Sequence, residues 1–154
     1  MAKYLIILTF FIYSCVNSND LVKVNHEFND VFFDVVEKQI VFEGKLPQNL
    51  ESIAKKWFSN NVKVDGLEGK MNLKLFNYQE NIVNINDGKR IELSLSFLVL
   101  IEKELFSDRK EIKGEINAYS NITGDFSLEE VDTLILNSQA ELILLLSKKL
   151  QSMN

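Results

Sequence analysis

The segment I-E-L-S-L-S-F-L-V-L-I, from Ile91 to Ile101, contains the longest run of alternating apolar residues in this 154-residue sequence. The apolar positions are Ile91, Leu93, Leu95, Phe97, Val99 and Ile101. Because successive side chains of a strand point to opposite faces, this period of two predicts a long β-strand with one face in the core. The opposite face starts polar and becomes apolar at Leu98 and Leu100. We expect a loop or helix of this chain to cover that second apolar area; a partner or an acyl chain is the alternative.

Three more strands are predicted around this segment. Asn86-Asp87-Gly88 is a hairpin turn signal and joins it to an upstream strand in which Met71, Leu73 and Leu75 alternate with polar residues. Downstream, Ser107-Asp108-Arg109 predicts a turn into a strand that ends near Ile122, where Gly114 suggests a bulge or bend. The earliest strand is predicted at Phe32 to Glu43, which is rich in β-branched and aromatic residues.

Two helices are predicted from apolar residues at helical spacing. The first has Pro47 in its first turn and ends at Asn60 and Asn61. Its apolar face consists of Leu50, Ile53, Ala54, Trp57 and Phe58, and we interpret Trp57 as a core residue rather than a ligand-stacking one. The second helix starts with a capping box, in which Ser127 and Glu130 satisfy each other's backbone donors, and continues to Leu150.

These elements predict an α+β fold in the order β-α-β-β-β-α. We expect an antiparallel sheet of about four strands with both helices on one face, forming a single domain over residues 31–154. The hydrophobic content of 46% is enough to form a core, so extensive disorder is not expected.

The N-terminus has the pattern of an export signal. Lys3 precedes an apolar run from Tyr4 to Tyr13, and the small residue Ser14 stands before Cys15, the only cysteine. A run of ten residues is too short to span a bilayer, which takes about 20. The segment Ile12-Tyr13-Ser14-Cys15 resembles the lipobox of bacterial, and specifically proteobacterial, envelope lipoproteins. The resemblance implies a signal peptide over residues 1–14, and a lipidated cysteine with its tether over residues 15–30.

That resemblance also implies a location. Lipid chains such as palmitate on Cys15 would anchor the protein to a membrane without spanning it, and two or more chains hold firmly. Val16, rather than aspartate, follows the cysteine. By similarity to proteobacterial sorting, this favours the periplasmic face of the outer membrane. The alternatives are an ordinary signal peptide that leaves a free thiol, or a short buried helix.

Composition argues against several functional classes. The net charge of −5 and the absence of a basic cluster speak against nucleic acid as a partner. The single histidine, His26, is expected on the surface, and no Ser/His/Asp set can be built without it. The sequence contains no metal-ligand, thiol-redox or phosphate-loop motif. We therefore expect no enzyme activity, no catalytic residue, no metal and no cofactor.

The order of elements after the lipobox resembles the LptE family of lipopolysaccharide-assembly lipoproteins. One departure is Val16-Asn17-Ser18, where that family tends to carry an aromatic and basic motif. The segments Leu46 to Phe58 and Gly66 to Leu75 are similar to small uncharacterised alphaproteobacterial lipoproteins. These resemblances transfer no functional residue.

Two functions follow as hypotheses. The first is a non-catalytic outer-membrane lipoprotein that acts as an assembly or accessory subunit with an envelope protein partner, with lipopolysaccharide transport as the specific role. The second is a periplasm-facing module that binds a lipid or another apolar ligand at the strand face around Leu98 and Leu100.

Overall fold

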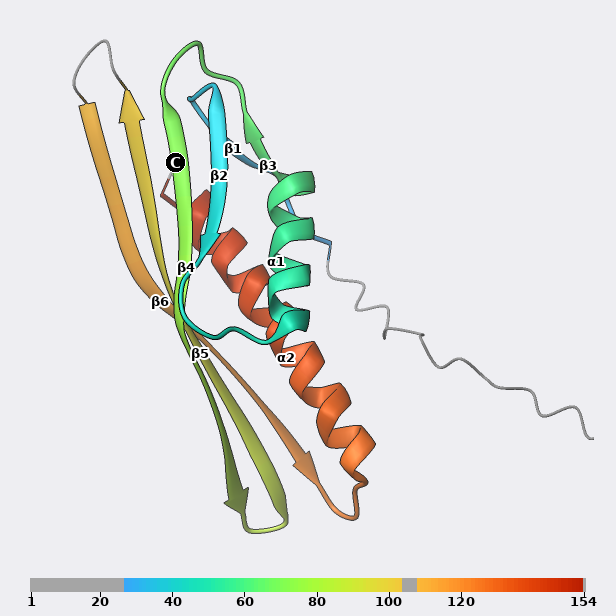
Figure 1. Cartoon of the computed structure of the whole chain (residues 1–154). Coiled ribbons are helices and arrows are strands. Elements are labelled where there is room, and N and C mark those ends of the chain that lie inside the picture. Colours follow the sequence, from blue (N-terminus) through green and yellow to red (C-terminus); the bar gives the residue numbers. More distant parts are fainter. Residues whose placement is uncertain (1–26, 104–107, 154) are drawn as a thin grey trace, which may run out of the picture.

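The protein forms two layers, a twisted sheet and a pair of helices packed on one of its faces (Figure 1). The computed structural model describes residues 27–103 and 108–153. The described elements are β1 (Val31–Phe33), β2 (Glu37–Phe42), α1 (Gln48–Asn61), β3 (Val62–Val64), β4 (Lys70–Ile85), β5 (Gly88–Lys103), β6 (Asp108–Thr123) and α2 (Leu128–Gln151). The predicted α+β class, with both helices on one face, is confirmed.

The main sheet is mixed rather than purely antiparallel. Its strand order is β2-β4-β5-β6, with β4–β5 and β5–β6 antiparallel. The β2–β4 pair is parallel, with Glu37 opposite Lys70 and Phe42 opposite Leu75. The chain runs through α1 and β3 between these strands and so returns to the end at which β2 started. Such a helical crossover joins parallel strands, and this is the reason the prediction of an all-antiparallel sheet is wrong.

The strand predicted from Phe32 to Glu43 is two strands. β1 pairs in parallel with β3, which the sequence analysis did not predict. The break between β1 and β2 comes from the loop before β4, whose backbone binds the intervening residues. Gly66 donates its N–H to the carbonyl of Val35 at 3.1 Å, and Val36 donates to the carbonyl of Gly69 at 3.1 Å.

The β4–β5 hairpin is confirmed, with Ile85 opposite Gly88 across the turn. Of the two alternatives predicted at Gly114, a bulge or a bend, the bulge is wrong, because the β5–β6 register continues through that residue without a shift. Gly114 instead leaves room for a ring, since a Cβ there would lie 2.8 Å from two ring carbons of Phe97. The turn predicted at Ser107-Asp108-Arg109 falls partly outside the described residues, and Asp108 already begins β6.

The bulge lies on β4 instead, between Phe76 and Gln79, where the β4–β5 register shifts. Asn77 adopts a left-handed conformation there, with φ of 52°. Asparagine tolerates this region better than most residues. The extra residue exchanges the two faces of β4: Tyr78 packs against the core, although unbroken alternation after Met71 would place it outside.

Both helices lie close to the predicted limits. α1 begins at Gln48, so Pro47 is the residue before the helix, and α1 ends at Asn61. The chain then passes directly into β3, with Val62 extended rather than left-handed. The capping box of α2 is confirmed, because the Glu130 N–H donates to Ser127 Oγ at 3.2 Å and the Ser127 N–H donates to Glu130 Oε2 at 2.7 Å.

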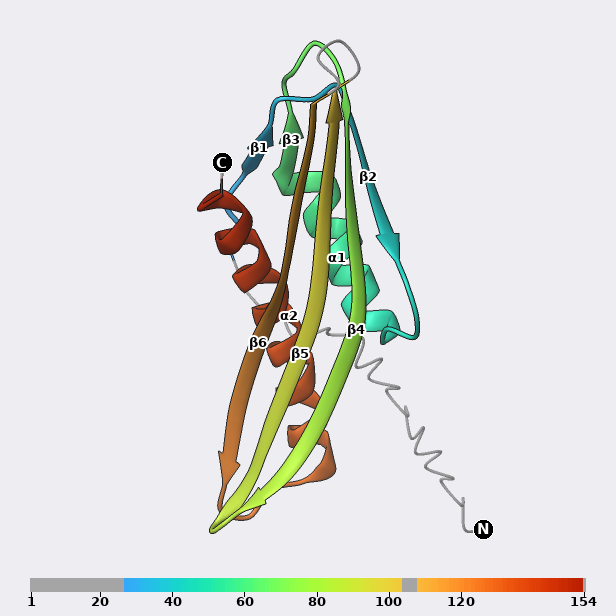
Figure 2. The ribbon, with the colours of Figure 1, turned by 90° about the vertical axis from the view of Figure 1, so that its left-hand side faces the viewer.

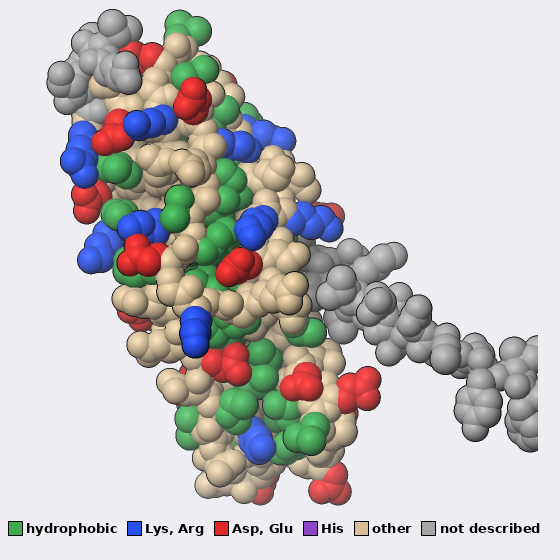
Figure 3. Space-filling view, viewed as in Figure 1, with side chains coloured by type: hydrophobic (Ala, Val, Ile, Leu, Met, Phe, Trp, Pro, Cys, Tyr) green, Lys and Arg blue, Asp and Glu red, His purple; other side chains and the backbone are tan. Residues whose placement is uncertain are grey.

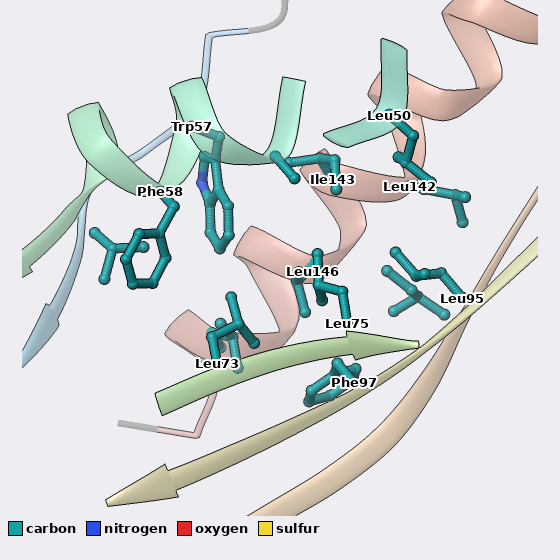
Figure 4. Close-up of a cluster of buried hydrophobic side chains, with 14 of the residues drawn as sticks. Leu50, Trp57, Phe58, Leu73, Leu75, Leu95, Phe97, Leu142, Ile143 and Leu146 are labelled. Atoms are coloured by element: carbon teal, nitrogen blue, oxygen red, sulfur yellow. The ribbon is translucent and has the colours of Figure 1, made fainter. Parts of the chain in front are cut away.

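The core lies between the helices and the inner face of the sheet (Figure 4). Side chains from both layers meet there, namely Leu50, Trp57 and Phe58 of α1, Leu142, Ile143 and Leu146 of α2, and Leu73, Leu75, Leu95 and Phe97 of the sheet. The assignment of Trp57 to the core is confirmed. The outer face of the sheet, seen from the front in Figure 2, is not covered by either described helix.

Candidate functional site

The predicted lipidation site, Cys15, lies outside the described residues, as do the predicted signal peptide at residues 1–14 and His26. Lipid attachment therefore stays a prediction at this point. The described part of the chain does show where the segment from Cys15 enters the fold.

At that entry point, three successive backbone carbonyls accept hydrogen bonds from the two helices. The carbonyl of Phe28 accepts from Asn61 Nδ2 at 2.8 Å, at the end of α1. The carbonyls of Asn29 and Asp30 accept from Ser147 Oγ at 3.4 Å and from Gln151 Nε2 at 3.0 Å, near the end of α2. Residues 28–30, which we predicted as the end of the tether, therefore belong to the folded part.

The apolar area predicted at Leu98 and Leu100 is on the outer face of β5, and both side chains are half-buried. No helix or loop of the described residues lies over it, so the expected internal cover is not found. Side chains of the two neighbouring strands, β4 and β6, flank these leucines and reduce their contact with solvent. Leu98 lies between Lys74 and Lys113, and Leu100 lies between Asn72 and Glu111.

Further along the same outer face the sheet forms a trough with a volume of about 520 Å³. Its floor is β5, where Ser94 is small, and its walls are longer side chains of the two neighbouring strands. Gln79 and Asn81 come from β4, and Glu115, Asn117 and Tyr119 come from β6. The trough is open to solvent, and its lining is more polar than apolar.

The cross-strand register places the trough residues in rows. One row contains Gln79, Ser94 and Asn117, and the next contains Asn81, Glu92 and Tyr119. Tyr119 is 73% exposed, which is unusual for an aromatic side chain on a sheet.

The one basic side chain that lines the trough, Arg90, already has several partners. Its Nε donates to Asn121 Oδ1 at 3.1 Å, and its guanidinium lies 5.9 Å from the Tyr119 ring centre. It also approaches Glu92 to 4.0 Å. Since Glu92 and Glu115 both line the trough, the site is unsuited to a strongly anionic ligand.

A smaller polar cluster lies on the inner face under α2. The Tyr78 hydroxyl donates to Glu80 Oε2 at 2.6 Å and accepts from Gln139 Nε2 at 3.4 Å. Burial, followed by the bond to Glu80, raises the pKa of Tyr78 well above its ordinary value. A tyrosine in this state stays protonated and acts as a hydrogen-bond donor. The cluster therefore attaches α2 to β4 and offers no activated nucleophile.

A second, smaller hollow of about 340 Å³ lies where the end of β6 meets the first turns of α2, and Asn121, Glu130 and Asn137 are among the residues that line it. Basic and acidic side chains intermingle on the face shown in Figure 3, with no continuous basic area. Within residues 27–103 and 108–153, no cluster of His, Cys, Asp or Glu could hold a metal ion. Neither described helix is long and apolar enough to cross a membrane.

Comparison with known proteins identifies a shared fold. The chain is similar to a crystal structure of a minor lipoprotein from Acinetobacter baumannii, with 13% identity, a TM-score of 0.53, and coverage of 77% of this chain and 93% of the other. It also matches rare lipoprotein B from Shewanella oneidensis, with 14% identity, a TM-score of 0.49, and coverage of 77% and 93%. No protein-family model matches the chain, and no curated protein matches it by sequence. The likeness to the Acinetobacter protein shows the fold.

Sequence reasoning found part of the trough floor but not the trough. The face of β5 that was predicted to start polar contains Glu92 and Ser94, and the structure confirms that both lie on the outer face of the sheet. The β4 wall was missed because the bulge at Asn77 moves Gln79 to the outer face. The pair Asn77-Tyr78 carries no motif that would have predicted this exchange.

Proposed function

We propose that this chain is a non-catalytic bacterial envelope lipoprotein, anchored by lipid on Cys15 to the periplasmic face of the outer membrane. The observation that carries the proposal is the N-terminal sequence, in which the only cysteine follows a short apolar run and a small residue. A fold shared with a lipoprotein of Acinetobacter baumannii supports it.

The proposed role is that of an assembly or accessory subunit that binds an envelope protein, with lipopolysaccharide transport as the specific process to test. An outer sheet face that neither described helix covers supports this role, because it leaves a surface on which a partner can bind. The fourteen residues from Cys15 to Phe28 are joined by thirteen steps that span at most about 45 Å when extended, so the domain would stay near the membrane surface.

The alternative of an apolar-ligand module has weaker support. Leu98 and Leu100 are half-buried between polar and charged neighbours and are not among the residues that line the trough. An acyl chain is better held in an enclosed apolar cavity than on such an exposed face.

Membrane fractionation of the native host tests the anchor. We expect wild-type protein in the outer-membrane fraction and Cys15→Ala protein outside it. Ser14→Ala is the matched control, because it keeps a small residue before the cysteine and should behave as wild type. Recovery of Cys15→Ala in the outer-membrane fraction in the same amount as wild type would contradict the proposed anchor.

A pull-down from mildly solubilised membranes tests the role. Recovery of a stoichiometric outer-membrane protein with the wild type, but less with Cys15→Ala, is the expected result. Recovery of lipid without any protein would contradict the subunit role and favour the apolar-ligand alternative.

A further inference from the structure

We propose that the trough on the outer face of β4, β5 and β6 binds an uncharged oligosaccharide that carries hydroxyl and acetamido groups. This inference is independent of the lipid anchor, because it rests on the trough residues alone.

The first argument is the hydrogen-bonding state of the walls. Gln79, Asn81 and Asn117 line the trough, and their side-chain amides bond to none of the described residues. Each amide offers two donors and an acceptor. Three such groups on opposite walls match a ligand that itself presents donors and acceptors along its length, as the hydroxyl and acetamido groups of a sugar chain do.

The second argument is Tyr119, which stands in the same row as Asn81 and is 73% exposed. An exposed tyrosine ring provides an apolar surface with little entropy to lose on binding. The Arg90 guanidinium lies over one side of this ring, 5.9 Å from its centre, so a ligand would pack against the other side. A rigid ring beside free amides can pack against the apolar face of a pyranose while the amides bind its substituents.

The third argument is the charge of the site. Its lining includes two carboxylates, Glu92 and Glu115, and one guanidinium, which Asn121 and Glu92 already contact. Phosphate groups would be repelled, and the exposed side chains offer no enclosed apolar surface for an acyl chain.

The dimensions agree with a single sugar chain. The β4 and β6 walls are two strand spacings apart, about 9–10 Å. In the first row the small side chain of Ser94 lowers the floor between them, and in the second row Glu92 lies between Asn81 and Tyr119. Successive rows of outward side chains are about 7 Å apart along the strands. Two rows therefore present contacts to more than one sugar ring of a bound chain.

Solution NMR tests the proposal with chitotetraose as the probe. The full chain would carry Cys15→Ser, so that no lipid is attached, in a zwitterionic detergent without a sugar head group. We expect saturable shifts of the side-chain NH₂ signals of Gln79, Asn81 and Asn117. Maltotetraose, which has the hydroxyl groups but not the acetamido groups, should bind at least tenfold more weakly.

Two variants make the test specific. Tyr119→Ala should weaken chitotetraose binding at least tenfold, while Leu128→Ala, which removes an apolar side chain that is 81% exposed outside the trough, should leave it unchanged. Absence of saturable shifts up to about 10 mM, a tenfold excess over a millimolar Kd, would overturn the proposal. Equal binding of maltotetraose would overturn the acetamido assignment, and shifts that survive in Tyr119→Ala would overturn the site.

Discussion

The two faces of the β4–β6 sheet have opposite properties although the same strands build them. On the inner face, Leu75, Leu95 and Phe97 are fully buried under α1 and α2. On the outer face, Ser94 and Asn117 line an open polar trough. Because side chains alternate along a strand, one set of residues in each strand stabilises the fold and the other set stays accessible to a ligand. Substitutions on the inner face should therefore lower the free energy of unfolding, and substitutions on the outer face should change ligand binding instead.

Phe97→Ala is the strongest test of this separation. Phe97 is 0% exposed, and we expect the truncation to lower the free energy of unfolding by about 3–5 kcal/mol. Tyr119→Ala, on the outer face of the neighbouring strand, should change it by less than about 0.5 kcal/mol. Urea unfolding followed by circular dichroism measures both. If Phe97→Ala does not fold, Phe97→Leu can replace it, with a smaller expected loss of unfolding free energy. A loss in Tyr119→Ala as large as that in the Phe97 variant would contradict the distinction between a stabilising inner face and an outer face that contributes little to stability.

A charged residue on the inner side of β2 provides a second test. The Lys38 ammonium donates to the carbonyls of Phe58, at 3.0 Å, and of Ser59 and Val62, where α1 ends. We expect Lys38→Met, which keeps the apolar stem, to lower the free energy of unfolding by about 1–3 kcal/mol, because these carbonyls lose a charged donor. Lys56→Met, on the exposed side of α1, is the control. If Lys38→Met has the same free energy of unfolding as wild type, water replaces the ammonium as the donor to these carbonyls without loss of stability.

The capping box should make the stability of α2, which covers the inner face of the sheet, depend on pH. Hydrogen bonds from the Ser127 N–H and hydroxyl lower the pKa of the Glu130 carboxyl from its usual 4.5. A carboxyl whose pKa is lower in the folded state stabilises the fold above its unfolded pKa, and this contribution is lost as the pH falls through the folded pKa. Glu130→Ala should therefore be less stable than wild type near neutral pH.

Urea unfolding over a pH series checks this expectation. The stability difference between wild type and Glu130→Ala should narrow as the pH falls below 4.5. Glu129→Ala, which removes an acidic residue from the same turn but leaves the capping box intact, should show a smaller effect. A Glu130→Ala difference that does not change with pH would rule out the capping carboxylate as its cause.

The smallest effect is expected for an ion pair on the outer face. Lys74 Nζ lies 2.7 Å from Glu43 Oε2, and both side chains are exposed. A double-mutant cycle with Lys74→Gln and Glu43→Gln should give a coupling below about 1 kcal/mol that decreases with added salt. A coupling above about 2 kcal/mol would show that this face contributes to stability as the inner face does.

The sequence predicted those elements that local signals specify. The alternation from Ile91 to Ile101 identified β5 and its buried face, and the Asn86-Asp87 turn identified the hairpin. Ser127 and Glu130 identified the start of α2. Each of these features depends on residues close together in the chain, whose period or turn chemistry is readable without tertiary information.

The remaining features depend on contacts between distant segments. The division between β1 and β2 comes from backbone bonds to Gly66 and Gly69, and the parallel β2–β4 pair comes from the path through α1. The trough requires the bulge at Asn77 and the alignment of three strands. Local propensity does not encode these arrangements, so a fold class could be predicted while the candidate binding surface could not.

The proposed function rests on a lipid at Cys15, and mass spectrometry of the N-terminal peptide from protein purified out of host membranes tests this most directly. The account predicts a peptide that begins at Cys15 and carries a diacylglyceryl group on its sulfur. A peptide that retains residues 1–14, or one with an unmodified Cys15 thiol, would contradict it.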